Sequence, residues 1–138
     1  PKEQREREIV FDGEKVLLVE DNELNQEIAV TLLKMRNLEI DIAKNGREAV
    51  EKFLASKEQE YRAILMDIQM PVMNGYEAAK AIRACRRGDA LSVPIYAMTA
   101  NAFANDVSEA IASGMNGHLA KPVDFQELSK VLKREWGS

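Results

Sequence analysis

Five side chains that could bind or transfer a charged oxygen group each stand just after a short apolar run. They are Glu20, Asp21, Asp67, Thr99 and Lys121. If these runs are parallel strands of one sheet, their carboxyl ends meet at one edge, which is where such sheets bind ligands. The pattern therefore predicts three carboxylates, a hydroxyl and an ammonium in one pocket, although these groups lie far apart in the sequence.

The three carboxylates indicate a bound cation. Like charges within a few ångströms disfavour ionisation, so Glu20, Asp21 and Asp67 would repel one another without a positive charge between them. Oxygen ligands, only a few of them from protein, favour Mg²⁺ or Mn²⁺, with water and a phosphate completing the coordination. Calcium is less expected because the sequence contains no Asp-x-Asp-x-Asp-Gly loop.

Lys121 and Thr99 suit the oxygens of a phosphoryl group, since one offers an ammonium charge and the other a hydroxyl donor. With a metal they predict phosphoryl transfer in which Asp67 is the nucleophile and its neighbours stabilise the moving group. Each residue alone also has a structural interpretation, because carboxylates and hydroxyls are common at turns and helix starts. It is much less expected that all five residues stand at strand ends by chance than that any one of them does.

Apolar runs alternate with stretches of helical periodicity along the chain. The candidate strands are residues 16–19, 38–43, 63–66, 93–98 and 117–120. Between them, apolar residues recur every three or four positions, as Leu24, Ile28, Leu32 and Met35 do. This alternation predicts a doubly wound α/β sandwich, in which helices cover both faces of a five-stranded parallel sheet.

Composition narrows the class of protein. The 138 residues make about one domain, and 46% hydrophobic with 30% charged residues is typical of soluble globular chains. The net charge of −4 gives no general attraction to nucleic acid or anionic lipid, so we expect this domain to contact neither. One cysteine and one histidine exclude a disulfide framework and the usual zinc sites. We expect a cytoplasmic location, although a parent protein could be anchored in a membrane.

Four short motifs follow one another between about Lys15 and Arg134. They are VEDN at 19–22, MDIQMPVMNG at 66–75, MTA at 98–100 and LAKP at 119–122. Together they resemble the response-regulator receiver domain of two-component signalling. The resemblance implies a flavodoxin-like fold with strand order 2-1-3-4-5. It also divides the chain into a polar tether over residues 1–14 and a receiver domain over residues 15–136.

The resemblance implies a role in phosphate chemistry for several motif residues. Asp67 becomes the phosphoacceptor, and Thr99, Lys121 and the amide of Ala100 bind the phosphoryl oxygens. A cis peptide bond before Pro122 is also implied, and the small cis penalty of bonds to proline permits it.

The resemblance also implies metal ligands and residues that tune the reaction. Glu20, usually through water, and Asp21, Asp67 and the backbone carbonyl of Gln69 would hold Mg²⁺. Gln69 and Asn101 each lie two residues beyond a site residue, where family members vary and tune the lifetime of the acyl phosphate.

The output switch of the family departs from its commonest pattern in this chain. Thr99 matches the switch hydroxyl, but the aromatic position, usually Tyr or Phe, is His118. His118 is either a partly exposed polar ring on the last strand or a switch residue, and both interpretations stay open. Imidazole groups in general titrate near neutral pH, so a histidine in the switch would make it pH-sensitive.

The predicted function is transfer of a phosphoryl group from a phosphohistidine to Asp67, which then changes partner binding. The domain would phosphorylate and dephosphorylate only itself. Asn22, Asn25 and Gln26 after the acidic pair resemble receivers of hybrid sensor histidine kinases, so the expected partners are a histidine kinase domain or a histidine phosphotransfer protein.

Three other functions are considered as alternatives to this interpretation. One is the receiver of a response regulator, stand-alone or with a DNA-binding or other output domain. Another is a pseudo-receiver, an interaction module that is never phosphorylated. A haloacid-dehalogenase-type phosphatase is disfavoured, because it needs a second aspartate two residues after the nucleophile, where this chain has Gln69.

Overall fold

The structure is a computed structural model that describes residues 9–100 and 104–137. Its strands are β1 (Lys15–Val19), β2 (Glu39–Ala43), β3 (Ala63–Asp67), β4 (Ile95–Thr99) and β5 (Gly117–Ala120). Its helices are α2 (Glu23–Lys34), α3 (Gly46–Ala55), α4 (Gly75–Arg83), α5 (Ala104–Ala112) and α6 (Phe125–Glu135). Strands and helices alternate along the chain, as the sequence predicts.

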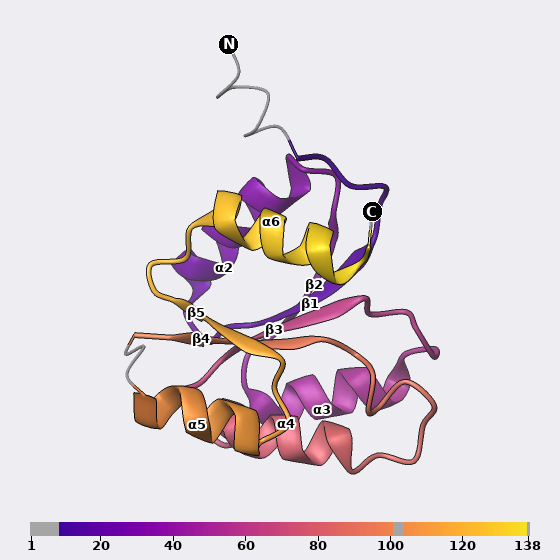
Figure 1. Cartoon of the computed structure of the whole chain (residues 1–138), viewed down its shortest axis with the longest axis vertical. Coiled ribbons are helices and arrows are strands. Elements are labelled where there is room, and N and C mark those ends of the chain that lie inside the picture. Colours follow the sequence, from indigo (N-terminus) through magenta and orange to yellow (C-terminus); the bar gives the residue numbers. More distant parts are fainter. Residues whose placement is uncertain (1–8, 101–103, 138) are drawn as a thin grey trace.

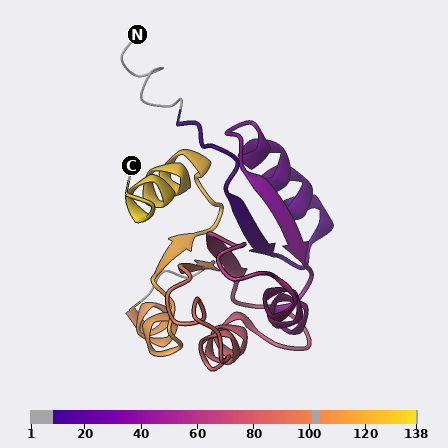
Figure 2. The same ribbon diagram turned by 90° about the vertical axis from the view of Figure 1, so that its right-hand side faces the viewer.

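The strands form one sheet in the order β2-β1-β3-β4-β5, and every neighbouring pair is parallel. Helices α2 and α6 cover one face of the sheet, and α3, α4 and α5 cover the other (Figure 1). The view turned by 90° shows the same three layers (Figure 2). The predicted fold and strand order are confirmed, and all carboxyl ends of the strands lie at one edge.

Burial of the central strands explains their composition. All five residues of β3 and of β4 are buried, whereas the edge strands β2 and β5 are only partly buried. Each face of the sheet packs its own hydrophobic cluster, one centred on Phe53 and Ile82 and the other on Leu33 and Leu132. A parallel sheet covered on both faces requires such apolar strands, so polar side chains are left for the strand ends.

The side chains that α2 buries are not the ones whose recurrence indicates a helix in the sequence. Ala29 and Leu33 are buried against the sheet, whereas Leu24, Ile28 and Met35 are 64%, 46% and 72% exposed. The recurring apolar positions do mark a helix, but two stripes compete on it. Packing against β1 and β3 selects the stripe with the smaller residue, which lets the helix approach closely. An apolar strip is therefore left on the surface of α2.

The packed part of the chain begins before the expected boundary at Lys15. Phe11 is only 5% exposed, and its ring packs edge-on against Trp136 at 5.3 Å between centroids. Its backbone N–H donates to the carbonyl of Arg36 at 2.8 Å. Residues 9–14 of the expected tether therefore pack on the domain, while residues 1–8 lie outside the described part of the chain.

Among the described residues, no helix combines the length and the apolar character needed to cross a lipid bilayer.

A buried ion pair supports the connection between α4 and β4, at the end of the sheet away from the strand carboxyl ends. Asp89 accepts hydrogen bonds from Arg87 Nε and Nη2, both at 3.0 Å, and from the amide of Gln59 at 2.8 Å. Burial alone would raise the pKa of Asp89, but these hydrogen bonds and the guanidinium charge outweigh burial and hold its pKa below the ordinary value.

Replacing Asp89 by alanine is expected to lower the free energy of unfolding at neutral pH by about 3 kcal/mol, because it leaves the Arg87 charge without its partner. The pKa of Asp89 is lower in the folded than in the unfolded chain, so its stabilisation is complete above the unfolded-state pKa. It is lost as the pH falls through the folded-state pKa. Chemical denaturation of wild type and Asp89→Ala at a series of acidic pH values should show that the difference in their free energies of unfolding shrinks as the pH falls.

The matched control is Glu58→Ala. Glu58 is an exposed carboxylate that accepts a hydrogen bond from Gly88 N at 2.7 Å in the same region. Its loss should change the stability by no more than about 0.5 kcal/mol. A deficit in Asp89→Ala that stays constant down to the lowest pH would contradict the linkage to this carboxylate.

Candidate functional site

The carboxyl ends of the strands surround a cleft of about 790 Å³. Its lining includes the residues that the sequence assigned to the site: Glu20, Asp21, Asp67, Gln69, Thr99, Ala100 and Lys121. His118 is exposed on β5 and does not line the cleft, so both interpretations of it stay open. Asn101 lies outside the described residues.

An ion pair stands at the centre of the cleft. Lys121 Nζ lies 2.8 Å from Asp67 Oδ1 and 3.9 Å from Glu20 Oε1. The side chains of Asp67 and Glu20 are only 5% and 6% exposed, whereas the side chain of Lys121 is 28% exposed. An ion pair this close is stronger in a buried setting than in water, and here the ammonium reaches both carboxylates from the open side.

Three carboxylates cluster in the cleft, and Lys121 pairs with two of them. Ligand oxygens of Glu20, Asp21 and Asp67 all lie within 4.8 Å of one another. Burial raises the pKa of Glu20, and the charge of Asp67 adds to the rise, although a hydrogen bond from the Asn22 amide and the charge of Lys121 oppose it. Clustered hard oxygen donors with a surplus of negative charge fit a divalent cation such as Mg²⁺.

Hydrogen bonds from β2 and α2 hold Glu20 in place. Its amide donates to the carbonyl of Ala43 at 3.0 Å, and its own carbonyl accepts from Gln26 Nε2 at 2.7 Å. The backbone amide of Asn22 donates a hydrogen bond to Glu20 Oε2 at 3.1 Å, and the side chain of Asn22 caps the start of α2. The supporting bond from Gln26 was not foreseen from the sequence. The only local signal was a polar side chain in the first turn of the helix behind the acidic pair.

The start of α4 holds the end of β3 and therefore Asp67. The amide of Gly75 donates to the carbonyl of Ile68 at 2.9 Å, and Asn74 and Glu77 cap the helix reciprocally. A Cβ atom at Gly75 would lie 2.5 Å from the carbonyl oxygen of Asp67. Only glycine lets the helix come this close, so the sequence pair Asn74-Gly75 fixes the backbone beside Asp67.

The fourth and fifth strands bring Thr99 and Lys121 to the same edge. Thr99 is the last residue of β4 and is 8% exposed, and its carbonyl accepts from the amide of Lys121 at 2.8 Å. Ala100 follows it and is exposed at the rim of the cleft. The peptide bond between Lys121 and Pro122 is cis, as the resemblance implied.

Taken together, these groups can hold an anionic oxygen group and a divalent cation side by side. Asp67 offers a carboxylate oxygen that opens to the cleft, and Lys121 stands next to it as a fixed positive charge. Thr99 adds a hydroxyl on the neighbouring strand. This donor set fits phosphoryl-group chemistry better than acid–base chemistry on a neutral substrate, because every charged group is suited to bind either phosphate or metal.

Comparison with known proteins agrees with this chemistry. The family model described as "Response regulator receiver domain" matches residues 16–133. A curated relative, "Hybrid signal transduction histidine kinase I" of Dictyostelium discoideum, is 39% identical over 124 residues. That alignment covers 88% of this chain but only 7% of the relative, so the chain corresponds to a small part of that protein.

Two solved structures are similar to this chain. One is the receiver domain of the sensor histidine kinase PA1611 from Pseudomonas aeruginosa, whose active-site cleft coordinates a magnesium ion. It is 38% identical with a TM-score of 0.81, covering 92% of this chain and 100% of that one. The other is the receiver domain of the Saccharomyces cerevisiae response regulator Ssk1, solved with the phosphotransfer protein Ypd1. It is 38% identical with a TM-score of 0.79, covering 90% of this chain and 89% of that one.

A divalent cation is expected to raise the melting temperature of the wild type, because it binds the folded cluster and not the unfolded chain. Asp21→Asn removes the one exposed carboxylate of the cluster and is expected to weaken Mg²⁺ binding about tenfold or more, the loss seen even for groups that only support a ligand. Thermal unfolding in chelator and in a series of Mg²⁺ concentrations measures this loss.

The control is Glu23→Gln, which neutralises another exposed carboxylate in the first turn of α2, outside the cluster. It should keep the full response to Mg²⁺. An equal loss of response in both variants would show that Mg²⁺ acts through general surface charge instead of through the cluster.

Proposed function

The chain belongs to the response-regulator receiver family, and on that premise we propose that Asp67 accepts a phosphoryl group from a phosphohistidine of a partner protein. The observation that carries this proposal is the ion pair between Lys121 Nζ and Asp67 Oδ1, 2.8 Å long, in a cleft with two further carboxylates. The product is an aspartyl phosphate, and the signal is the change in partner binding that this product causes.

In the proposed reaction an oxygen of Asp67 attacks phosphorus as the bond from phosphorus to the imidazole nitrogen breaks. The bonding electron pair leaves with the imidazole, and an acyl phosphate forms on Asp67. Lys121 stays beside the reacting oxygen and neutralises the phosphoryl oxygens, while Thr99 and the amide of Ala100 donate hydrogen bonds to them. Asp67 attacks as the carboxylate that pairs with Lys121, so the proposed step needs no general base.

Metal ligands in this proposal are Glu20, Asp21, Asp67 and the backbone carbonyl of Gln69. When bound there, Mg²⁺ supplies positive charge that stabilises the phosphoryl oxygens, and Mn²⁺ would serve the same role. Gln69 is exposed at the rim of the cleft, where its side chain would influence the access of hydrolytic water to the acyl phosphate. Asn101 is proposed for the same tuning role.

The proposed output surface consists of α5, β5 and α6. Thr99 leads into the connection to α5, and Lys121 lies directly between β5 and α6. Both groups that meet the phosphate therefore belong to segments that carry this surface. His118 lies on β5 and is exposed, which suits a residue that changes its contacts with a partner.

We further propose that the parent protein is a hybrid histidine kinase of cytoplasmic signalling. The support is the similarity to the Dictyostelium hybrid kinase and to the receiver of a Pseudomonas sensor kinase. The alternative, a response regulator with its own output domain, is supported by the similarity to the receiver of Ssk1. In either parent, the expected partner is a histidine kinase domain or a histidine phosphotransfer protein.

The exposed strip on α2 is the proposed docking face for that partner. Leu24 and Ile28 lie on the helix that starts beside Glu20, and Ile28 also lines an apolar groove of about 620 Å³ toward Phe125. Asp67 is only 4% exposed, so a phosphohistidine reaches it only if its protein lies against the rim of the cleft. The apolar strip lies on the helix that begins beside this cleft and provides the contact area.

Asp67→Asn is expected to take up no phosphate from acetyl phosphate with Mg²⁺, because an amide cannot act as the nucleophile. Intact mass spectrometry of the wild type should show a gain of one phosphoryl group that chelation of Mg²⁺ suppresses. Asp12→Asn, which changes an exposed carboxylate outside the cleft, should be labelled like the wild type.

Comparable labelling of Asp67→Asn would contradict the assignment of the phosphoacceptor. An unlabelled wild type would favour the pseudo-receiver alternative, and turnover of free phosphoesters would favour a phosphatase. These three outcomes are distinct in the same assay when inorganic phosphate is measured beside protein mass.

Replacing Leu24 and Ile28 together by alanine is expected to slow phosphoryl transfer from a phosphorylated histidine phosphotransfer protein about tenfold, equivalent to about 1.4 kcal/mol of lost contact energy. Labelling by acetyl phosphate should not change, because that donor needs no docking face. The control Leu54→Ala removes a similarly exposed apolar side chain from α3, on the other face of the sheet. Equal slowing by Leu54→Ala would contradict a specific docking face on α2.

A further inference from the structure

The backbone carbonyl of Glu20 lies where the hydrogen-bond ladder between β1 and β2 ends. The two strands pair as far as Val19 and Ala43, and the amide of Glu20 still donates to the carbonyl of Ala43 at 3.0 Å. Strand β2 stops at Ala43, whereas the next acceptor along β1 is the carbonyl of Glu20. Glu20 is buried, and a buried carbonyl without a donor costs free energy. This carbonyl therefore needs a partner from outside the sheet.

Gln26 supplies that partner from the first turn of α2. Its Nε2 donates to the carbonyl of Glu20 at 2.7 Å. Ala29 and Leu33, the two side chains that α2 buries, stand three and seven residues further along the helix. Residues at this spacing share one face of a helix, so Gln26 is the polar member of the stripe that faces the sheet.

The peptide unit that Gln26 holds carries both members of the acidic pair. Glu20 contributes the carbonyl of this unit and Asp21 its nitrogen, and the unit is planar and nearly rigid. A hydrogen bond to the carbonyl therefore restricts the whole unit, from whose two ends the side chains of Glu20 and Asp21 project. Ligand oxygens of these residues and Asp67 lie within 4.8 Å of one another. A rotation of the peptide unit would change that spacing.

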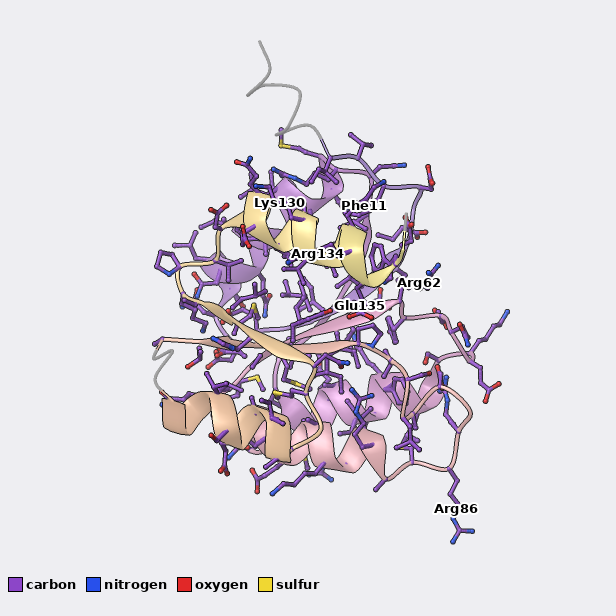
Figure 3. The ribbon with its side chains drawn as sticks, in the orientation of Figure 1. Phe11, Arg62, Arg86, Lys130, Arg134 and Glu135 are labelled. Atoms are coloured by element: carbon purple, nitrogen blue, oxygen red, sulfur yellow. The ribbon has the colours of Figure 1, made fainter. Side chains whose placement is uncertain are left out.

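Charge alone does not hold the three carboxylates together, because like charges repel at this spacing. Lys121 is the only cationic side chain among the described residues that line the cleft. Lys130 and Arg134 lie along α6, where Figure 3 labels them, and are not part of that lining. Hydrogen bonds from neutral groups such as the Gln26 amide are therefore needed to fix the acidic pair.

We infer that Gln26 is a positioning residue for a divalent cation bound by Glu20, Asp21 and Asp67. This role rests on the metal site of the proposed function. The side-chain amide of Gln26 acts through the backbone, because it holds the peptide unit between Glu20 and Asp21 in the orientation that brings both carboxylates to the cluster. Ligands that are already in place bind a metal ion more tightly than ligands that must first be ordered.

This role gives a physical meaning to the polar residues that follow the acidic pair in the sequence. Asn22 meets the carboxylate of Glu20 with its backbone amide, and Gln26 meets the carbonyl of the same residue with its side chain. The start of α2 thus holds one metal ligand at its side chain and at its backbone.

Mn²⁺ is the probe of the first test, because electron paramagnetic resonance measures the unbound ion directly. Gln26→Met keeps the length of the side chain and removes the donor. It is expected to weaken Mn²⁺ binding at neutral pH about tenfold, the lower end of the loss found for groups that support a ligand. Thr31→Val removes an exposed polar group from the same helix and should bind Mn²⁺ like the wild type. Equal affinities of Gln26→Met and the wild type would overturn the positioning role.

Gln26→Glu separates the hydrogen bond from charge, and it also serves if Gln26→Met fails to fold. A glutamate has the size of glutamine, but at neutral pH it cannot donate a hydrogen bond and it adds a negative charge near the cluster. Loss of the donor should weaken Mn²⁺ binding, whereas an effect of charge alone would strengthen it. Tighter binding by Gln26→Glu would therefore contradict the positioning role.

Thermal unfolding distinguishes positioning of the metal ligands from simple support of the fold. The melting temperature in chelator reports the fold alone, and its rise at a fixed Mn²⁺ concentration reports binding to the folded state. This rise should be smaller in Gln26→Met than in the wild type. A variant that melts earlier in chelator but shows the full rise would mean that Gln26 only supports the fold, and the positioning role would be wrong.

The outcomes separate this role from the proposed function. If the wild type binds no Mn²⁺, the metal site fails and the role of Gln26 fails with it. If the wild type binds Mn²⁺ and acetyl phosphate labels Asp67, but both Gln26 variants bind Mn²⁺ like the wild type, only the role of Gln26 is overturned. If Mn²⁺ binding weakens in the variants while Asp67 of the wild type is never labelled, the role of Gln26 is supported and the phosphoacceptor function fails.

Discussion

The ion pair between Lys121 and Asp67 is the interaction on which the rest of the structure depends. A carboxylate as buried as Asp67 is costly to ionise unless a positive charge lies next to it. Lys121 provides that charge from a connection more than fifty positions along the chain, so the fold must bring the ends of β3 and β5 to one edge. The parallel sheet does this without placing either residue inside the core. It also leaves Lys121 open to solvent on one side, where a second anionic group can reach it.

The cluster remains electrostatically incomplete with this pair alone. Glu20, Asp21 and Asp67 carry three negative charges against the one positive charge of Lys121, so a surplus of two negative charges stays in the cleft. The raised pKa of Glu20 is a sign of this surplus and of burial. One divalent cation would neutralise it. The cluster therefore fits a metal ion, and the hydrogen bonds from Asn22 and Gln26 hold Glu20 beside the other carboxylates.

The sequence predicted the site better than it predicted the packing around it. A polar residue directly after an apolar run is a local signal, so Asp67, Thr99 and Lys121 could be placed at strand ends without knowledge of long-range contacts. The buried face of α2 depends on what the sheet accepts, so the recurrence of Leu24 and Ile28 indicates a helix without showing which side chains it buries. Phe11 ends a short apolar run that begins at Ile9 within the expected tether, and its distant partner Trp136 explains its burial. Tertiary contacts decide such positions, and one sequence does not display them.

The proposed phosphorylation would change the charge that Lys121 meets. A phosphoryl group replaces the single charge of the carboxylate with about −1.5 to −2 and adds acceptor oxygens beyond the original position. A bound cation and Lys121 would then neutralise phosphoryl oxygens, which lie farther from β3 than the carboxylate oxygens do. Lys121 sits on a short connection whose amide is bonded to Thr99, and three residues later that connection becomes α6. Leu128 and Leu132 are fully buried in that helix, so the segment that carries Lys121 continues into an element that is fixed to the sheet.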